Sequence, residues 1–81
     1  MKIRTMDGTA YEGTALQIVN GMKSMSFMAS HMKIKEYVNF VADQADLYSD
    51  VKLKVEGDTD EETASSLVTQ LLQHGLLREG V

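Results

Sequence analysis

The sequence predicts a small α+β protein with the element order ββααβα, in which the helices pack on one face of a small sheet. Residues 2–5 and 9–13 flank Asp7-Gly8, a dipeptide typical of tight hairpins. Apolar residues recur at helical spacing in three later stretches, and after Asp50 they alternate with polar residues, as in a strand. A chain of 81 residues fits one domain, residues 1–81.

The N-terminal hairpin can pair in two registers. A two-residue loop places Ile3 opposite Glu12. A three-residue loop with Gly8 in the left-handed conformation places Ile3 opposite Tyr11 and Lys2 opposite Glu12. We favour the second register because apolar and opposite-charge pairs across strands each stabilise by roughly 0.2–1 kcal/mol.

The first helix is expected to begin after Thr14 and to end near Met25. Thr14 and Gln17 have the spacing of a capping box. Gly21 weakens this helix by roughly 1 kcal/mol relative to alanine. Its apolar face consists of Ala15, Ile18, Val19 and Met22. A connector, residues 26–32, then leads to the next helix, for which Ser30 is the expected N-cap.

The stretch Ile34 to Tyr48 predicts the helix against which the sheet and the other two helices pack. Three of the five aromatic residues, Tyr37, Phe40 and Tyr48, fall in this stretch. Its apolar residues follow the spacing of one helix face, and they are Ile34, Tyr37, Val38, Val41, Ala42, Ala45 and Tyr48.

Residues 51–55 predict the third strand because the period changes from 3.6 to 2. Val51, Leu53 and Val55 share one face, whereas Lys52 and Lys54 share the other. We expect the apolar face to be buried and the lysine face to be in water.

The last helix is expected to follow the turn at residues 56–58. Thr59 and Glu62 have capping-box spacing, and acidic residues in the first turn suit the helix dipole. Gly75 is a typical left-handed stop, after which Leu76 folds back. The apolar face consists of Ala64, Leu67, Val68, Leu71 and Leu72. The tail after this helix can add a short extended segment.

Several of these motifs together resemble a family of short bacterial proteins of uncharacterised function. The family has a "DG-x-x-YEGT" hairpin, matched here from Asp7 to Thr14, followed by an "IV-x-x-M" helix, matched here from Ile18 to Met22. The resemblance also covers Glu36-Tyr37-Val38 and the closing Leu71-Leu72 with Gly75-Leu76-Leu77. It implies the same small domain and adds no known activity.

Composition narrows the class of protein. The chain has no cysteine, so disulfides and thiolate metal sites are not expected. No apolar run approaches the ~18 residues of a membrane span, and Met1 to Arg4 does not begin a signal peptide, so we expect a cytoplasmic protein. The net charge of −4 argues against a general nucleic-acid binder.

Two groups of apolar residues are candidates for an interaction surface. Phe40 and Leu47 extend the apolar arc of the central helix beside Tyr37. They form either a surface for self-association or a partner, or a part of the core that the first helix or the tail covers. The second group is a series of methionines at intervals of three to four residues, Met22, Met25, Met28 and Met32. These methionines can fill the core, line an adaptable groove for a partner helix, or hold Cu(I) together with His31.

A basic sheet face is the alternative site. If the strand at 51–55 pairs with the first strand, Lys2, Arg4, Lys52 and Lys54 share one face and can meet phosphate groups. Tyr11 is expected on the opposite face, so this surface lacks an aromatic platform for bases.

No set of residues predicts an enzyme, a cofactor site or a metal site. His31 and His74 stand in no catalytic or ligand pattern, and Gly8 and Gly13 are hairpin glycines rather than a phosphate loop. The acidic residues near Asp60 lack the spacing of a calcium loop. We therefore expect a non-catalytic protein-interaction module that forms a homodimer or joins a complex. The alternative is a small regulator that contacts nucleic acid through the basic face.

Overall fold

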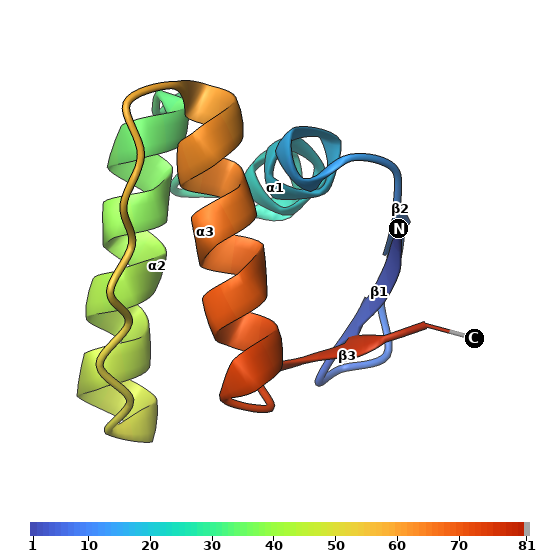
Figure 1. Ribbon diagram of the computed structural model, residues 1–81. Coiled ribbons are helices and arrows are strands. Elements are labelled where there is room, and N and C mark those ends of the chain that lie inside the picture. Colours follow the sequence, from blue (N-terminus) through green and yellow to red (C-terminus); the bar gives the residue numbers. More distant parts are fainter. Residues whose placement is uncertain (81) are drawn as a thin grey trace.

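The computed structural model describes residues 1–80, which form a three-stranded antiparallel sheet and three helices that lie to one side of it (Figure 1). The α+β class is therefore confirmed. The predicted order ββααβα is wrong in its second half, because the third helix precedes the third strand. The elements are β1 (Lys2–Thr5), β2 (Ala10–Glu12), α1 (Ala15–Met25), α2 (Ile34–Ser49), α3 (Asp60–Gln73) and β3 (Leu77–Glu79).

The N-terminal hairpin has the predicted register, with Ile3 opposite Tyr11 and Lys2 opposite Glu12. Gly8 has φ +93°, as the three-residue loop requires. The Asp7 carboxylate closes the turn by accepting hydrogen bonds from the Thr5 hydroxyl and from the backbone N–H of Thr9. The bond from Thr5 is the main cause that lowers the pKa of Asp7.

The prediction of a strand at residues 51–55 is wrong. This segment is extended but pairs with no strand of residues 1–80, and it runs back along α2 to the start of α3 (Figure 1). Its alternation still holds, since Val51, Leu53 and Val55 are half-buried and the two lysines between them are exposed. Leu53 and Val55 pack against the helical core. Alternation of apolar and polar residues indicates that one face of an extended segment is covered. Here helices cover that face, and the segment does not belong to a sheet.

The third strand of the sheet is β3, from the tail that the sequence suggested as a short extended segment. The strand order is β2-β1-β3, and β3 runs antiparallel to β1. Arg4 lies opposite Arg78, and Thr5 lies opposite Leu77. The chain therefore places its N-terminal strand in the middle of the sheet and leaves β2 and β3 as edges.

Most helix boundaries follow the predicted capping chemistry. Thr14 and Thr59 are N-caps, and each side chain accepts a hydrogen bond from the third residue of its helix. The prediction of Ser30 as the N-cap of α2 is wrong, because Lys33 occupies that position. There the Glu36 side chain accepts a hydrogen bond of 3.2 Å from the backbone N–H of Lys33, which satisfies a free donor without Ser30.

α3 ends at the predicted glycine. Gly75 has φ +74°, and the N–H of Leu76 donates to the carbonyl oxygen of Leu71 at 2.9 Å. This reversal directs the chain into β3.

The core is centred on α3 rather than on α2, contrary to the prediction for Ile34 to Tyr48. α3 packs against α1, α2 and β3, whereas α2 has no contact with a strand among the described residues. Ala64, Leu67 and Val68 are fully buried and share one face of α3, which the other elements cover. The small side chain of Ala64 allows close approach of its neighbours. In the described part of the chain, no helix has the length and apolar character needed to cross a membrane.

Candidate interaction surfaces

The end of α1 and the connector that follows it display three large apolar side chains to solvent. Phe27 is 98% exposed, and Met25 and Met28 are each 74% exposed. We call these three residues the connector patch. Because burial of apolar surface stabilises by about 25 cal/mol per Å², a fully exposed phenylalanine is a costly feature in isolation.

The backbone under the connector patch is held in place. Ala29 is fully buried, and its N–H donates to the carbonyl oxygen of Ser26 at 3.2 Å. The Lys23 ammonium donates to the carbonyl oxygen of Ser30 at 2.7 Å. These contacts fix successive turns, so the connector presents Phe27 from an ordered backbone.

The predicted methionine cluster divides into two pairs. Met22 and Met32 are half-buried and pack against the core, as expected for methionines that fill irregular gaps. Met25 and Met28 point to solvent beside Phe27 in the sequence. The sequence analysis did not select Phe27, although an aromatic residue among small residues of a connector is a usable signal.

The aromatic arc of α2 is partly covered. Tyr37 is buried, so it presents little surface to a partner. Phe40 is half-buried and stacks on Tyr37, with ring centroids 6.4 Å apart and the planes 10° from parallel. Leu47 is 72% exposed, and Tyr48 is 76% exposed although its spacing predicted burial. We call Leu47 and Tyr48 the α2 patch.

The total surface is consistent with incomplete coverage of apolar side chains. The chain exposes 5417 Å², whereas a monomer of this mass is expected to expose about 4,850 Å². The Cα radius of gyration is 11.4 Å, close to the value of about 11.7 Å for a compact chain of this length. The additional area therefore comes from projecting side chains and not from an elongated backbone.

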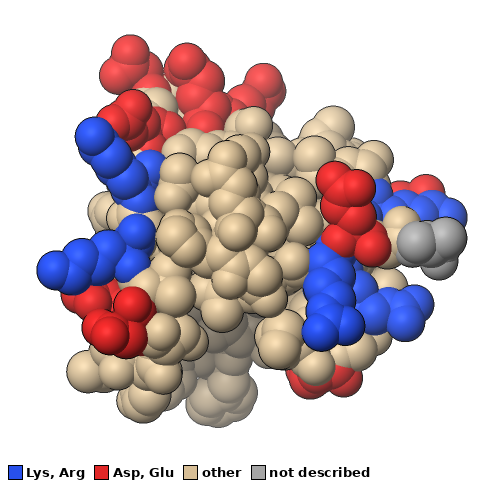
Figure 2. Space-filling view, turned by 60° about the horizontal axis from the view of Figure 1, so that its bottom comes forward, with Lys and Arg blue, Asp and Glu red and all other residues tan. Residues whose placement is uncertain are grey.

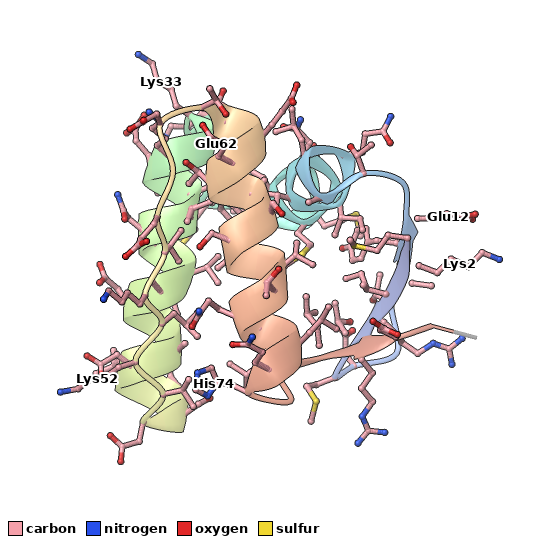
Figure 3. The ribbon with its side chains drawn as sticks, in the orientation of Figure 1. Lys2, Glu12, Lys33, Lys52, Glu62 and His74 are labelled. Atoms are coloured by element: carbon pink, nitrogen blue, oxygen red, sulfur yellow. The ribbon has the colours of Figure 1, made fainter. Side chains whose placement is uncertain are left out.

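The predicted basic face of Lys2, Arg4, Lys52 and Lys54 does not form. Lys52 and Lys54 lie on the extended segment beside α2, on the opposite side of the molecule from the sheet. Figure 3 shows Lys2 and Lys52 pointing in opposite directions. In Figure 2 the basic side chains fall into two groups on either side of an uncharged surface. The nucleic-acid hypothesis loses half of its predicted residues because residues 51–55 do not join the sheet.

The structure adds a basic residue that the sequence analysis did not select. Arg78 is exposed on β3, opposite Arg4. Helices cover the other side of this sheet, so we call the outward-facing side, with Lys2, Arg4 and Arg78, the open face. Glu12 also points outward there, beside Lys2 (Figure 3).

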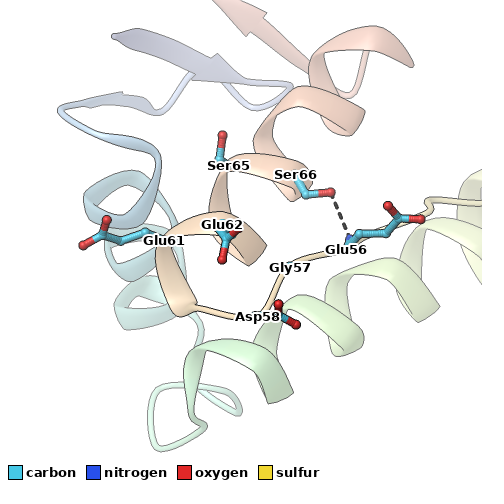
Figure 4. A pocket seen from close by; sticks show the side chains of 7 residues that line it. All are labelled: Glu56, Gly57, Asp58, Glu61, Glu62, Ser65 and Ser66. Atoms are coloured by element: carbon cyan, nitrogen blue, oxygen red, sulfur yellow. Dashed lines mark hydrogen bonds between the residues drawn. The ribbon is translucent and has the colours of Figure 1, made fainter.

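The acidic start of α3 borders a broad hollow of about 680 Å³. Its carboxylates splay apart, with Glu56 and Glu61 pointing to opposite sides (Figure 4). The backbone N–H of Glu56 donates to the Ser66 hydroxyl at 3.1 Å, which attaches the extended segment to α3. Within residues 1–80, no three His, Cys, Asp or Glu side chains lie close enough together to hold a metal ion.

The comparisons with known proteins give no relative. No protein-family model matches this chain, and neither does a curated protein or a solved structure. The resemblance to short bacterial proteins with the "DG-x-x-YEGT" hairpin stays a prediction. The candidate surfaces therefore depend on the geometry of this chain alone.

Proposed function

We propose that this chain is a non-catalytic interaction module that forms a homodimer through the connector patch. The observation that carries the proposal is Phe27, an aromatic side chain that is 98% exposed on an ordered connector. Exposed apolar groups of this kind mark association sites in small domains, whose cores are commonly completed by oligomerisation.

The chemistry of the connector patch favours a second copy of the chain as its partner. In a two-fold symmetric contact, each residue meets the same surface on the partner. Phe27 of one copy can then contact the thioethers of Met25 or Met28 of the other, and sulfur–aromatic contacts of this kind are favourable. The patch is thus complementary to itself.

The stretch of chain that contains the connector patch carries no formally charged side chain at pH 7, although lysines flank it at both ends. The nine residues 24–32 contain no Asp, Glu, Lys or Arg. A chain with net charge −4 repels its own copies over much of its surface, but this stretch can meet itself without placing like charges together. The patch is small beside a standard interface of about 800 Å² per partner, so a weak dimer with micromolar affinity is expected.

Sedimentation equilibrium at micromolar concentrations tests the proposal. The wild-type protein is expected to show a reversible monomer–dimer equilibrium. The variant Phe27→Ser with Met28→Ser is expected to be a monomer with an unchanged thermal unfolding midpoint, because both side chains are already exposed. Retention of the dimer in that variant would place the contact elsewhere.

The α2 patch provides a matched control. Leu47→Ser with Tyr48→Ser removes two other exposed apolar side chains from a different element. This variant is expected to dimerise like the wild type. A wild-type protein that remains strictly monomeric at the highest concentration would refute the homodimer.

A further inference from the structure

The open face of the sheet contains an unusual like-charge pair. Arg4 of β1 and Arg78 of β3 are directly opposite each other in the register and both are exposed. Like charges directly opposite across strands are destabilising. Among residues 1–80, the one ion pair within 4.0 Å is Lys54 with Glu56, far from this face, so neither arginine has a carboxylate oxygen within that distance.

A hollow of about 270 Å³ lies over the same face. Two small residues leave this space open. Ala10 lies opposite Arg4 on β2, and Gly80 follows β3 and donates a hydrogen bond of 2.8 Å to the carbonyl oxygen of Lys2. Lys2, Arg4 and Glu12 line the hollow, and Arg78 lies next to it, opposite Arg4.

The charge of this face differs in sign from that of the whole chain. Lys2, Arg4 and Arg78 carry three positive charges, and Glu12 carries one negative charge. The face therefore has an excess of two positive charges on a chain with net charge −4. Concentration of one sign on a single face attracts ligands of the opposite sign.

We propose that the open face binds a compact polyvalent phosphate anion, such as a di- or triphosphate group, between Lys2, Arg4 and Arg78. Outward-facing neighbours along a strand are about 6.6 Å apart, and directly opposed residues on adjacent strands are about 4.5–5.5 Å apart. Three cations this close together suit neighbouring phosphate groups. A guanidinium fork binds phosphate oxygens in a bidentate manner, so a bound anion offsets the Arg4–Arg78 repulsion.

The geometry favours a compact anion over a nucleic-acid strand. Tyr11 shares its register position with the buried Ile3, so its ring belongs to the helix-covered side of the sheet. The open face therefore offers no aromatic ring on which a base can stack. The basic residues that would extend the contact along a strand, Lys52 and Lys54, lie on the other side of the molecule. This site is separate from the connector patch and does not depend on dimer formation.

Titration of the full chain with sodium tripolyphosphate at low ionic strength tests the proposal, by calorimetry and by the thermal unfolding midpoint. The anion is expected to bind the wild type and to raise its midpoint, since a ligand that binds the folded state stabilises it. The variant Arg4→Gln with Arg78→Gln is expected to bind at least about tenfold more weakly. Without anion, this variant is expected to melt above the wild type because the repulsion is removed.

A variant with the same change in net charge distinguishes a specific binding site from general electrostatic attraction of the anion. Lys52→Gln with Lys54→Gln also removes two positive charges, but from the side of the molecule opposite the sheet. This variant is expected to bind tripolyphosphate like the wild type. Equal loss of binding in both double variants would overturn the proposal, as would absence of binding by the wild type. If the arginine double variant fails to fold, Arg78→Gln alone replaces it, because this residue is exposed on an edge strand.

A parallel titration with an oligothymidylate distinguishes a compact polyphosphate from the phosphate backbone of a nucleic-acid strand. The compact site predicts that single-stranded DNA binds no more tightly than tripolyphosphate at the same salt concentration. Tighter binding of the oligonucleotide, with a steeper dependence on salt, would overturn the proposal in favour of an extended nucleic-acid contact.

Discussion

The ring of Tyr11 lies against Gly21, where an added β-carbon would be 3.0 Å from Cδ1 of the ring. A glycine inside a helix costs about 1 kcal/mol relative to alanine. Here its missing side chain leaves room for the aromatic ring of β2 on α1. The contact joins the hairpin to the first helix, and it explains a residue that the sequence shows only as a weak point of the helix.

Gly21→Ala is expected to bring no net stabilisation in the wild type, because the gain in helix propensity is offset by crowding against Tyr11. In a Tyr11→Ala background, the same substitution is expected to stabilise by up to about 1 kcal/mol. Urea unfolding of the four proteins measures the coupling between the two residues. Equal stabilisation by Gly21→Ala in both backgrounds would show that the ring does not occupy this space.

Gly57→Ala is expected to destabilise the protein by more than about 2 kcal/mol. Gly57 has φ +147°, and an added β-carbon would lie 2.7 Å from the backbone nitrogen of Thr63. The clash involves backbone of the first turn of α3, which cannot move without disturbing the core. Thermal or urea unfolding measures the loss.

Gly75→Ala is the matched control for this prediction. Gly75 also has a positive φ, +74°, but no atom lies within 4 Å of its added β-carbon. Its cost is expected to be about 1 kcal/mol, from the backbone conformation alone. Equal losses at the two glycines would mean that the approach of α3 to Gly57 is not restrictive.

Amide hydrogen exchange is expected to distinguish the extended segment from a strand. Within residues 1–80, the N–H groups of residues 52–55 have no hydrogen-bond acceptor, whereas β1 is paired on both sides. Residues 52–55 should therefore exchange rapidly and β1 slowly. The flanking N–H groups of Val51 and Glu56, which donate to Ala45 and Ser66, serve as an internal comparison. If residues 52–55 are as strongly protected as β1, the segment is hydrogen-bonded as a strand and this prediction is wrong.

Alkaline pH is expected to destabilise the wild type more than Tyr37→Phe. Burial raises the pKa of the Tyr37 phenol above its usual value of 10.0. The unfolded chain then ionises first, so the contribution of Tyr37 is fully present below pH 10 and is lost as the pH rises through the raised folded pKa. Urea unfolding at several pH values between neutral and strongly alkaline measures this difference.

Absorbance titration of the folded protein provides a direct check of the same group. The phenols of Tyr37 and Tyr11 are both expected to ionise late in the wild type, because burial raises the pKa of each. The late component should therefore be smaller in Tyr37→Phe than in the wild type. Indistinguishable stability profiles of the two proteins would mean that Tyr37 is not shielded from water.

Local chemistry was predictable because its partners are close in sequence. Asp7-Gly8 determines the hairpin, and the pairing of Ile3 with Tyr11 follows from the loop length. Thr14 and Thr59 begin helices because each caps an N–H only three residues later. Gly75 ends a helix because the left-handed conformation needs no β-carbon.

Long-range packing was not predictable from the same patterns. The alternation of Val51, Leu53 and Val55 shows that one side of the segment is covered, but it carries no information about what covers it. The helical spacing of Tyr48 likewise predicts a direction and not a neighbour, and its side chain is 76% exposed at the end of α2. Both errors arise because periodicity describes a single element.

The candidate sites follow the same division. The sequence by itself determined the class of the fold, the hairpin register, most of the caps, and the position of the connector. The tertiary structure alone decided that α3 occupies the centre, that Phe27 stays in solvent, and that Arg78 comes to lie beside Arg4. The physical reason is that backbone conformation depends on nearby residues, whereas burial and charge proximity depend on which distant surfaces compete for the same contact.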